Sequence, residues 1–94
     1  MVGGLTGSLG ILVYTLDQHD EAISLLERAL EIAEQIGNPH DQGAHLTALG
    51  ATYADMEQID TAVAYYQRAL ALFEEIQSPD AEEVREFLAE LIDE

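Results

Sequence analysis

The sequence predicts an all-α protein that folds as a solenoid of αα-hairpins. Apolar residues recur at offsets of three, four and seven through most of the chain, which is the period of an amphipathic helix. The same helix–turn–helix pattern occurs twice, about 40 residues apart, and repeats of this length are typical of solenoids. Short polar segments join the helical runs, so neighbouring helices should lie antiparallel. We therefore expect two hairpins and one further helix, which makes five helices.

The more regular hairpin is expected in the second half of the chain. Its first helix should run from about Ala44 to Met56 and its second from Asp60 to Ile76. Residues 57–59 leave room only for a tight reversal. Small residues occupy the positions where we expect the two helix backbones to approach most closely: Gly50, Ala62 and Ala69. Large residues flank them, as in interlocking helix pairs.

The first repeat is expected to be a weaker copy of this hairpin. A first helix should run from Met1 to Thr15, a turn should follow at 16–19, and Asp20 should cap a second helix from Glu21 to Ile36. The first helix contains four glycines, each costing about 1 kcal/mol relative to alanine in a helix interior: Gly3, Gly4, Gly7 and Gly10. No capping residue precedes it, as expected for a segment cut from a longer array.

Turn-forming residues separate the predicted units. Gly37 is a typical helix stop. Asn38-Pro39 and Ser78-Pro79 each combine an N-cap residue with a proline suited to the first helical position. The predicted units are repeat one at 1–38, repeat two at 39–78 and a C-terminal capping helix at 79–94.

The capping helix is expected from Asp80 to Ile92. Its apolar residues fall on one face: Val84, Phe87, Leu88 and Leu91. Acidic residues fill the opposite face. A helix of this kind at the end of a repeat array covers the apolar face of the last hairpin.

The pattern of residues resembles the tetratricopeptide repeat family. In that family a large residue, Leu-Gly and Tyr mark the first helix, and Ala, a large residue and Ala mark the second. The second repeat has the whole pattern: Leu46, Leu49, Gly50, Tyr53, Ala62, Tyr66 and Ala69. The first has most of it: Leu9, Gly10, Ala22, Leu26 and Ala29, with Val13 where Tyr is usual and Thr6 where a large residue is usual. The spacing is longer than the family's usual 34 residues and is similar to its variants with a long second helix.

The resemblance implies a site for a protein partner. First helices of the family line a concave groove that binds extended or helical peptides. Transferred to this sequence, the groove residues are Gly7, Ile11, Tyr14, Ala44, Thr47, Ala51, Ala54, Asp55, Val84, Phe87 and Leu91. None of them is Lys, Arg or Asn, so the grip on a peptide carboxylate that some family members have is not expected. Alternatively, these small residues only allow neighbouring repeats to pack closely.

The charge of the chain excludes several classes of partner. It contains 19 acidic residues and three arginines but no lysine, for a net charge of −16. Phosphate backbones and anionic membranes should be repelled, so we expect no nucleic acid and no membrane partner. Basic partners would be attracted, although the charge could serve solubility alone. The longest apolar stretch, Leu5–Leu16, is shorter than the ~20 residues that cross a bilayer, and it lacks signal-peptide features. We expect a cytoplasmic protein.

The sequence offers little for catalysis or for cofactors. Its glycine-rich segment 3–10 lacks the lysine of a phosphate-binding loop, and no serine lies in a nucleophile elbow. His40 and His45 would lie about 140° apart around a helix, which is poor geometry for one metal ion. We expect no enzyme, no cofactor and no metal. The expected function is a non-catalytic module that binds a peptide or protein. The alternative is structural self-association, as a homo-oligomer through the N-terminal helix or by stacking in a longer array.

Overall fold

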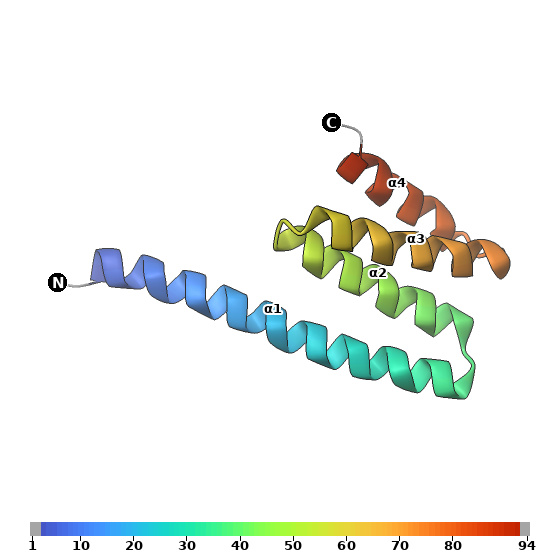
Figure 1. Cartoon of the computed structure of the whole chain (residues 1–94), viewed down its shortest axis with the longest axis horizontal. Coiled ribbons are helices and arrows are strands. Elements are labelled where there is room, and N and C mark those ends of the chain that lie inside the picture. The colour runs from blue at the N-terminus through green and yellow to red at the C-terminus, as the bar shows by residue number, and fades with distance from the viewer. Residues whose placement is uncertain (1–2, 93–94) are drawn as a thin grey trace.

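The chain folds into four successive α-helices. The computed structural model describes the backbone of residues 3–92 and the side chains of residues 18–92. The helices are α1 (Gly3–Ile36), α2 (Pro39–Asp55), α3 (Ile59–Glu75) and α4 (Asp80–Ile92), as Figure 1 shows. No strand is present within residues 3–92. The predicted all-α helical repeat is confirmed, but the predicted number of five helices is wrong.

The missing helix boundary lies in the first repeat. The turn predicted at 16–19 and the N-cap predicted at Asp20 are both absent, because α1 continues through them. Neither glycine nor proline occurs between Ile11 and Ile36, so no residue in this segment prevents a continuous helix. In the second repeat the corresponding turn places Glu57 at φ 62°. A left-handed residue costs roughly 1–2 kcal/mol, so this turn forms only where helix packing offsets its cost.

The three helix ends that lie inside the chain share one hydrogen-bond pattern. A residue with positive φ follows each helix: Gly37 (81°), Glu57 (62°) and Gln77 (56°). The next amide then donates back to the last turn, as in Ser78 N to Phe73 O at 2.8 Å. This is the Schellman closure, in which a left-handed residue ends the helix. The stop predicted at Gly37 is confirmed.

The side chains of Asn38 and Ser78 accept hydrogen bonds from backbone amides at the starts of α2 and α4, as predicted. The Asn38 Oδ1 accepts from the Asp41 amide at 3.2 Å, and Pro39 is the first residue of α2. Ser78 Oγ accepts from the Asp80 amide at 3.1 Å. The cap on α2 is confirmed. Ser78 accepts a hydrogen bond from an amide of α4 as predicted, but α4 begins at Asp80 and not at Pro79. With its cap, α2 begins earlier than the Ala44 that the apolar pattern alone indicated.

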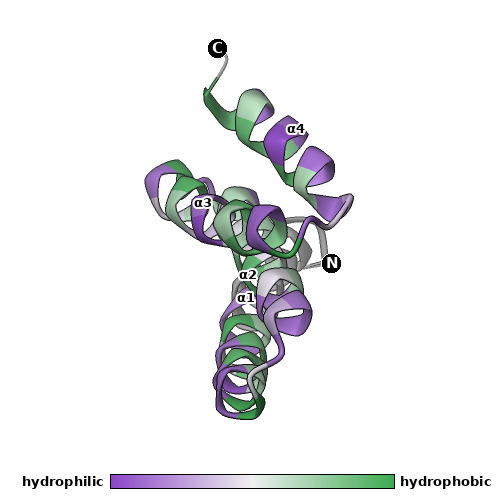
Figure 2. Cartoon of the chain, turned by 90° about the vertical axis from the view of Figure 1, so that its right-hand side faces the viewer, coloured by the Kyte–Doolittle hydropathy of each residue, from purple (hydrophilic) through white to green (hydrophobic). Residues whose placement is uncertain are grey.

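The core lies around the α2–α3 hairpin. Each helix packs on the next, and the view in Figure 2 shows α1 and α4 at opposite ends of the stack. The buried apolar residues come from all four helices: Leu30, Ala33, Leu46, Leu49, Ala62, Tyr66, Ala69, Phe73, Ala81, Val84 and Leu88. The predicted capping helix therefore buries its Val84 and Leu88 against the hairpin. Both α2 and α4 stand where the first helix of a repeat is expected, and residues of both line one surface of the protein.

Two glycines of α2 let aromatic rings of α3 approach its backbone. A Cβ on Gly43 would lie 2.7 Å from the Phe73 ring, and one on Gly50 would lie 2.8 Å from the Tyr66 ring. Gly50 faces α3, as predicted from the sequence. Its closest neighbour is an aromatic ring, however, and not the α3 backbone near Ala62 and Ala69.

Candidate functional site

A small hollow opens between α2 and α4. It has a volume of ≈ 230 Å³, and its lining residues come from α2, α3 and α4: Ala44, Thr47, Phe73, Asp80, Glu83 and Val84. We refer to it as the α2–α4 hollow. Three of its residues, Ala44, Thr47 and Val84, belong to the groove predicted from the sequence. The short side chains of Ala44 and Thr47 leave the space open.

The aromatic ring of Phe73 reaches the hollow from α3. It does so because Gly43 has no side chain, so the ring can lie directly on the α2 backbone. The Thr47 hydroxyl donates to the Gly43 carbonyl at 2.8 Å, so this polar group is satisfied within its own helix. Val84 is buried and closes the hollow from α4. The interior of the site is therefore mainly apolar.

A side-chain hydrogen bond joins the two helices beside this hollow. His40 Nε2 lies 3.1 Å from Asp80 Oδ2, and its ring packs against Phe73 with a centroid distance of 5.7 Å. The pair connects the first turn of α2 to that of α4. Glu83 is exposed on the same side of α4. The mouth of the hollow thus carries carboxylates, whereas its interior is apolar.

The other predicted groove residues do not line this hollow. On α2, Ala51 and Asp55 are exposed and Ala54 is half-buried. Phe87 and Leu91 are half-buried against the core, and the Phe87 ring lies 5.5 Å from that of Tyr66. The predicted residues Gly7, Ile11 and Tyr14 lie outside the residues whose side chains are described.

The predicted groove omitted three residues that line the hollow: Phe73, Asp80 and Glu83. Phe73 follows the helical spacing of apolar residues in α3, and this spacing predicts a place in the hairpin core only. The signal that could have found it is Gly43, whose missing side chain admits the ring between two first helices. The two acidic residues looked like part of a solvated helix face, and only the packing of α4 on α3 brings them beside α2.

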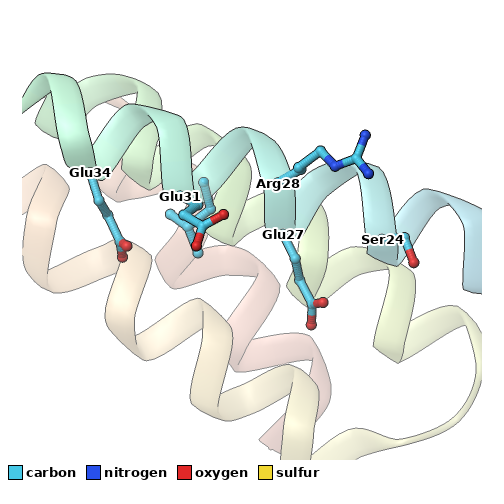
Figure 3. Close-up of a pocket in the computed structure, with 6 residues that line it drawn as sticks. Ser24, Glu27, Arg28, Glu31 and Glu34 are labelled. Atoms are coloured by element: carbon cyan, nitrogen blue, oxygen red, sulfur yellow. The ribbon is translucent and has the colours of Figure 1, made fainter.

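A second, larger hollow follows α1. It has a volume of ≈ 530 Å³ and is lined by Ser24, Glu27, Arg28, Leu30, Glu31 and Glu34. In Figure 3, Glu27 and Glu34 point to the same side of α1 and Arg28 points away from them. All of the lining residues lie on one helix, so the hollow is a shallow furrow between side chains. We find no convergent donors and acceptors there for a small ligand.

A network of aromatic and charged residues bridges the helices near this furrow. The Tyr53 and Tyr65 rings stack at 5.4 Å with an interplanar angle of 6°. Arg68 lies over the Tyr65 ring at 5.7 Å, and its Nη2 is 3.9 Å from Glu34 Oε2. Burial, followed by the negative charges of nearby groups, raises the pKa of Tyr53 above its usual 10.0. The network holds α1, α2 and α3 together and presents no reactive group.

The described residues offer no metal-binding cluster. Among them, no group of three or more His, Asp or Glu side chains could hold a metal ion. His40 pairs with Asp80, and His45 is half-buried elsewhere on α2. His19, which falls within the turn predicted at 16–19, is instead a half-buried residue of α1. None of the helices, over the part that the structure describes, is long and apolar enough to cross a membrane.

Comparison with known protein families agrees with this architecture. A family model described as tetratricopeptide repeat matches residues 4–75, which include α2, α3 and most of α1. No curated protein and no solved structure matched the chain. The family match covers most of the sequence, and it spans the positions of Gly50, Ala62 and Ala69, which pack the hairpin. The chain belongs to the tetratricopeptide repeat family.

Proposed function

We propose that this protein is a non-catalytic interaction module that binds a peptide segment of a partner protein across α2 and α4. The tetratricopeptide repeat family is a family of protein–protein interaction modules and is generally non-catalytic. The observation that carries the proposal is the α2–α4 hollow, which lies between two helices in first-helix positions. Such helices line the concave, partner-binding face of the family.

The size of the hollow limits what it accepts. Sites for drug-sized ligands have volumes of roughly 300–1,000 Å³, and this hollow is smaller. It therefore fits one apolar side chain of a longer segment. The rest of that segment would lie along α2, where the short side chains of Ala51 and Ala54 leave room for it.

The charge around the hollow favours a basic neighbour to that side chain. Asp80 and Glu83 line its mouth, and the chain as a whole has a net charge of −16. A lysine or arginine in the partner would be attracted over a distance comparable to the Debye length, ~8 Å at physiological ionic strength. The preferred segment thus combines one apolar residue with adjacent basic residues.

Selection from a phage-displayed library of random peptides tests this proposal. We expect enriched peptides to contain an apolar residue beside lysine or arginine. Glu83→Arg should weaken binding of an enriched peptide by about tenfold, or ~1.4 kcal/mol. Glu86→Arg is the matched control, because it is an exposed glutamate of α4 outside the hollow. Equal effects of the two substitutions, or no enrichment, would contradict the proposal.

A second candidate function is self-association, and a specific observation favours it. Leu25, Ile32 and Ile36 of α1 are exposed although they are large and apolar. Exposed apolar side chains grouped on one surface are characteristic of protein contacts.

A further inference from the structure

The exposed apolar residues of α1 form one continuous stripe. The side chains of Leu25, Ile32 and Ile36 are 60%, 52% and 73% exposed. On the same face, Ala22 precedes Leu25 and Ala29 lies between Leu25 and Ile32, and both alanines are only half-buried. The spacing along the stripe alternates between three and four residues, which is the spacing of helices that pair along their length.

The second repeat shows what covers this face in a complete hairpin. The counterparts of the stripe lie on α3: Ala62, Tyr65, Ala69, Leu72 and Ile76. Ala62 and Ala69 are fully buried, and Tyr65 stacks on Tyr53 of α2. The α3 face is therefore covered by α2, the first helix of its own hairpin. On α1 the same face has no such cover from the described side chains.

The chain contains a segment equivalent to the covering helix α2, but this segment is part of the same continuous helix as the stripe. Residues 3–16 are the counterpart of α2, with Leu9-Gly10 in place of Leu49-Gly50. They form the N-terminal half of α1, which extends past the hairpin in Figure 1. A continuous helix cannot fold back on itself, so this half cannot cover the stripe of its own chain.

We propose that a second copy of the chain supplies the cover, and that two α1 helices exchange their N-terminal halves in an antiparallel dimer. Residues 3–16 of each copy then lie on the stripe of the other. This inference is independent of peptide binding across α2 and α4, because it uses the opposite end of the stack. Exchange of an identical element is a simple route from a monomeric fold to a dimer.

The hairpin of the second repeat fixes the register of this dimer. There, Gly50 lies opposite Tyr66 and Gly43 lies opposite Phe73. Their counterparts place Gly10 of one copy opposite Leu26 of the other. The same register brings the two Gln18 residues together at the two-fold axis. Gln18 lies on the line of the stripe, one helical turn before Ala22.

The distribution of charge favours the antiparallel arrangement. Residues 3–16 carry no charged side chain, whereas 17–36 contain the acidic residues of α1. Antiparallel pairing places each uncharged half against an acidic half. Parallel pairing would place the two acidic halves together, where like charges repel. The antiparallel arrangement thus keeps the acidic halves of the two α1 helices apart.

The sequence at the centre of α1 allows both an exchanged and a closed form. Leu16-Asp17-Gln18 is the counterpart of Met56-Glu57-Gln58, which forms the tight turn of the second repeat. Asp17→Gly should favour the turn, because glycine adopts positive φ without strain. Asp17→Ala should favour the continuous helix. The first substitution is expected to shift the dimer towards monomer, and the second is expected to preserve it.

Cysteine crosslinking tests the register directly, because the chain contains no cysteine. We expect Gln18→Cys to form a disulfide-linked dimer under mild oxidation. Glu31→Cys is the control: in the proposed register its two copies lie about 40 Å apart, beyond the reach of a disulfide. Light scattering at about 100 μM should give twice the chain mass of 10.3 kDa.

Other outcomes would overturn the exchange. A strict monomer at that concentration would mean that the first repeat closes on itself through the turn at 16–18. A dimer in which Glu31→Cys crosslinks as readily as Gln18→Cys would have a different register. Leu25→Glu should abolish the dimer while the matched control Ile92→Glu, at an exposed site on α4, leaves it intact. Retention of the dimer in Leu25→Glu would also refute the stripe as its interface.

Discussion

Gly50 of α2 lies directly beneath the ring of Tyr66 on α3. A Cβ at Gly50 would be 2.8 Å from two ring carbons, which is closer than van der Waals contact allows. The ring is itself almost fully buried and also packs on Phe87 of α4. This contact therefore couples three helices: the absence of one side chain on α2 positions a ring of α3, and that ring supports α4.

The first prediction concerns this contact. Gly50→Leu should lower the free energy of unfolding by about 1–3 kcal/mol or more, because the new side chain would displace the buried ring of Tyr66. Ala51→Leu is the matched control, since Ala51 is the next residue of α2 and is exposed. Chemical denaturation should show a large loss for the first variant and little change for the second. Similar stabilities of the two variants would contradict the packing described.

The second prediction concerns the helix ends at Glu57 and Gln77. Both adopt positive φ although neither is a glycine. At the end of α1, the residue with positive φ is Gly37. Glu57→Gly and Gln77→Gly should each stabilise the fold by about 1 kcal/mol, because a left-handed residue with a Cβ is strained. Alanine at the same sites removes the polar side chain but keeps the strain. A gain from alanine equal to that from glycine would show that backbone strain is not the cause.

The third prediction concerns the charge of α4. Arg85 is its single basic residue between Asp80 and Ile92, and it pairs with Glu74 of α3 at 2.8 Å. The melting temperature should rise as NaCl is added up to about 0.2 M, because salt screens the repulsion among the carboxylates. Arg85→Gln should cost up to ~1 kcal/mol at low salt, as expected for an exposed pair. Arg28→Gln, which breaks no ion pair among the described residues, is the control. Steady destabilisation by salt would count against this account.

The fourth prediction concerns alkaline pH. Burial, followed by the negative charges of Asp55 and Glu90, raises the pKa of Tyr66 above its usual 10.0. The folded state therefore favours the neutral phenol. Its contribution to stability is complete below pH ~10 and is lost as the pH rises through the higher folded-state pKa.

Tyr66→Phe tests this dependence, because phenylalanine keeps the ring and removes the ionisable hydroxyl. We expect the variant to lose less stability than the wild-type chain between neutral pH and a pH above ~10. The free energy of unfolding, measured by urea denaturation across that range, gives the comparison. Identical pH profiles would show that ionisation of Tyr66 does not contribute.

The sequence by itself determined the local features of this protein. Asn38 and Ser78 cap helices because their side chains accept amide hydrogen bonds within two or three residues along the chain. Gly37 ends α1 because a single glycine tolerates positive φ. The helical spacing of apolar residues correctly assigned Leu46, Leu49 and Val84 to the core. These outcomes depend on neighbours in sequence and on periodicity, both of which can be seen without coordinates.

Only the tertiary structure decided whether a turn forms and which side chains share a site. The segments 16–18 and 56–58 have similar sequences, yet the first is helical and the second reverses the chain. The strain of the turn is offset by burial of α2 against α3, and that burial depends on distant residues. The α2–α4 hollow has the same origin. Phe73 reaches it because Gly43 on another helix lacks a side chain, and Asp80 and Glu83 face it because α4 packs on α3.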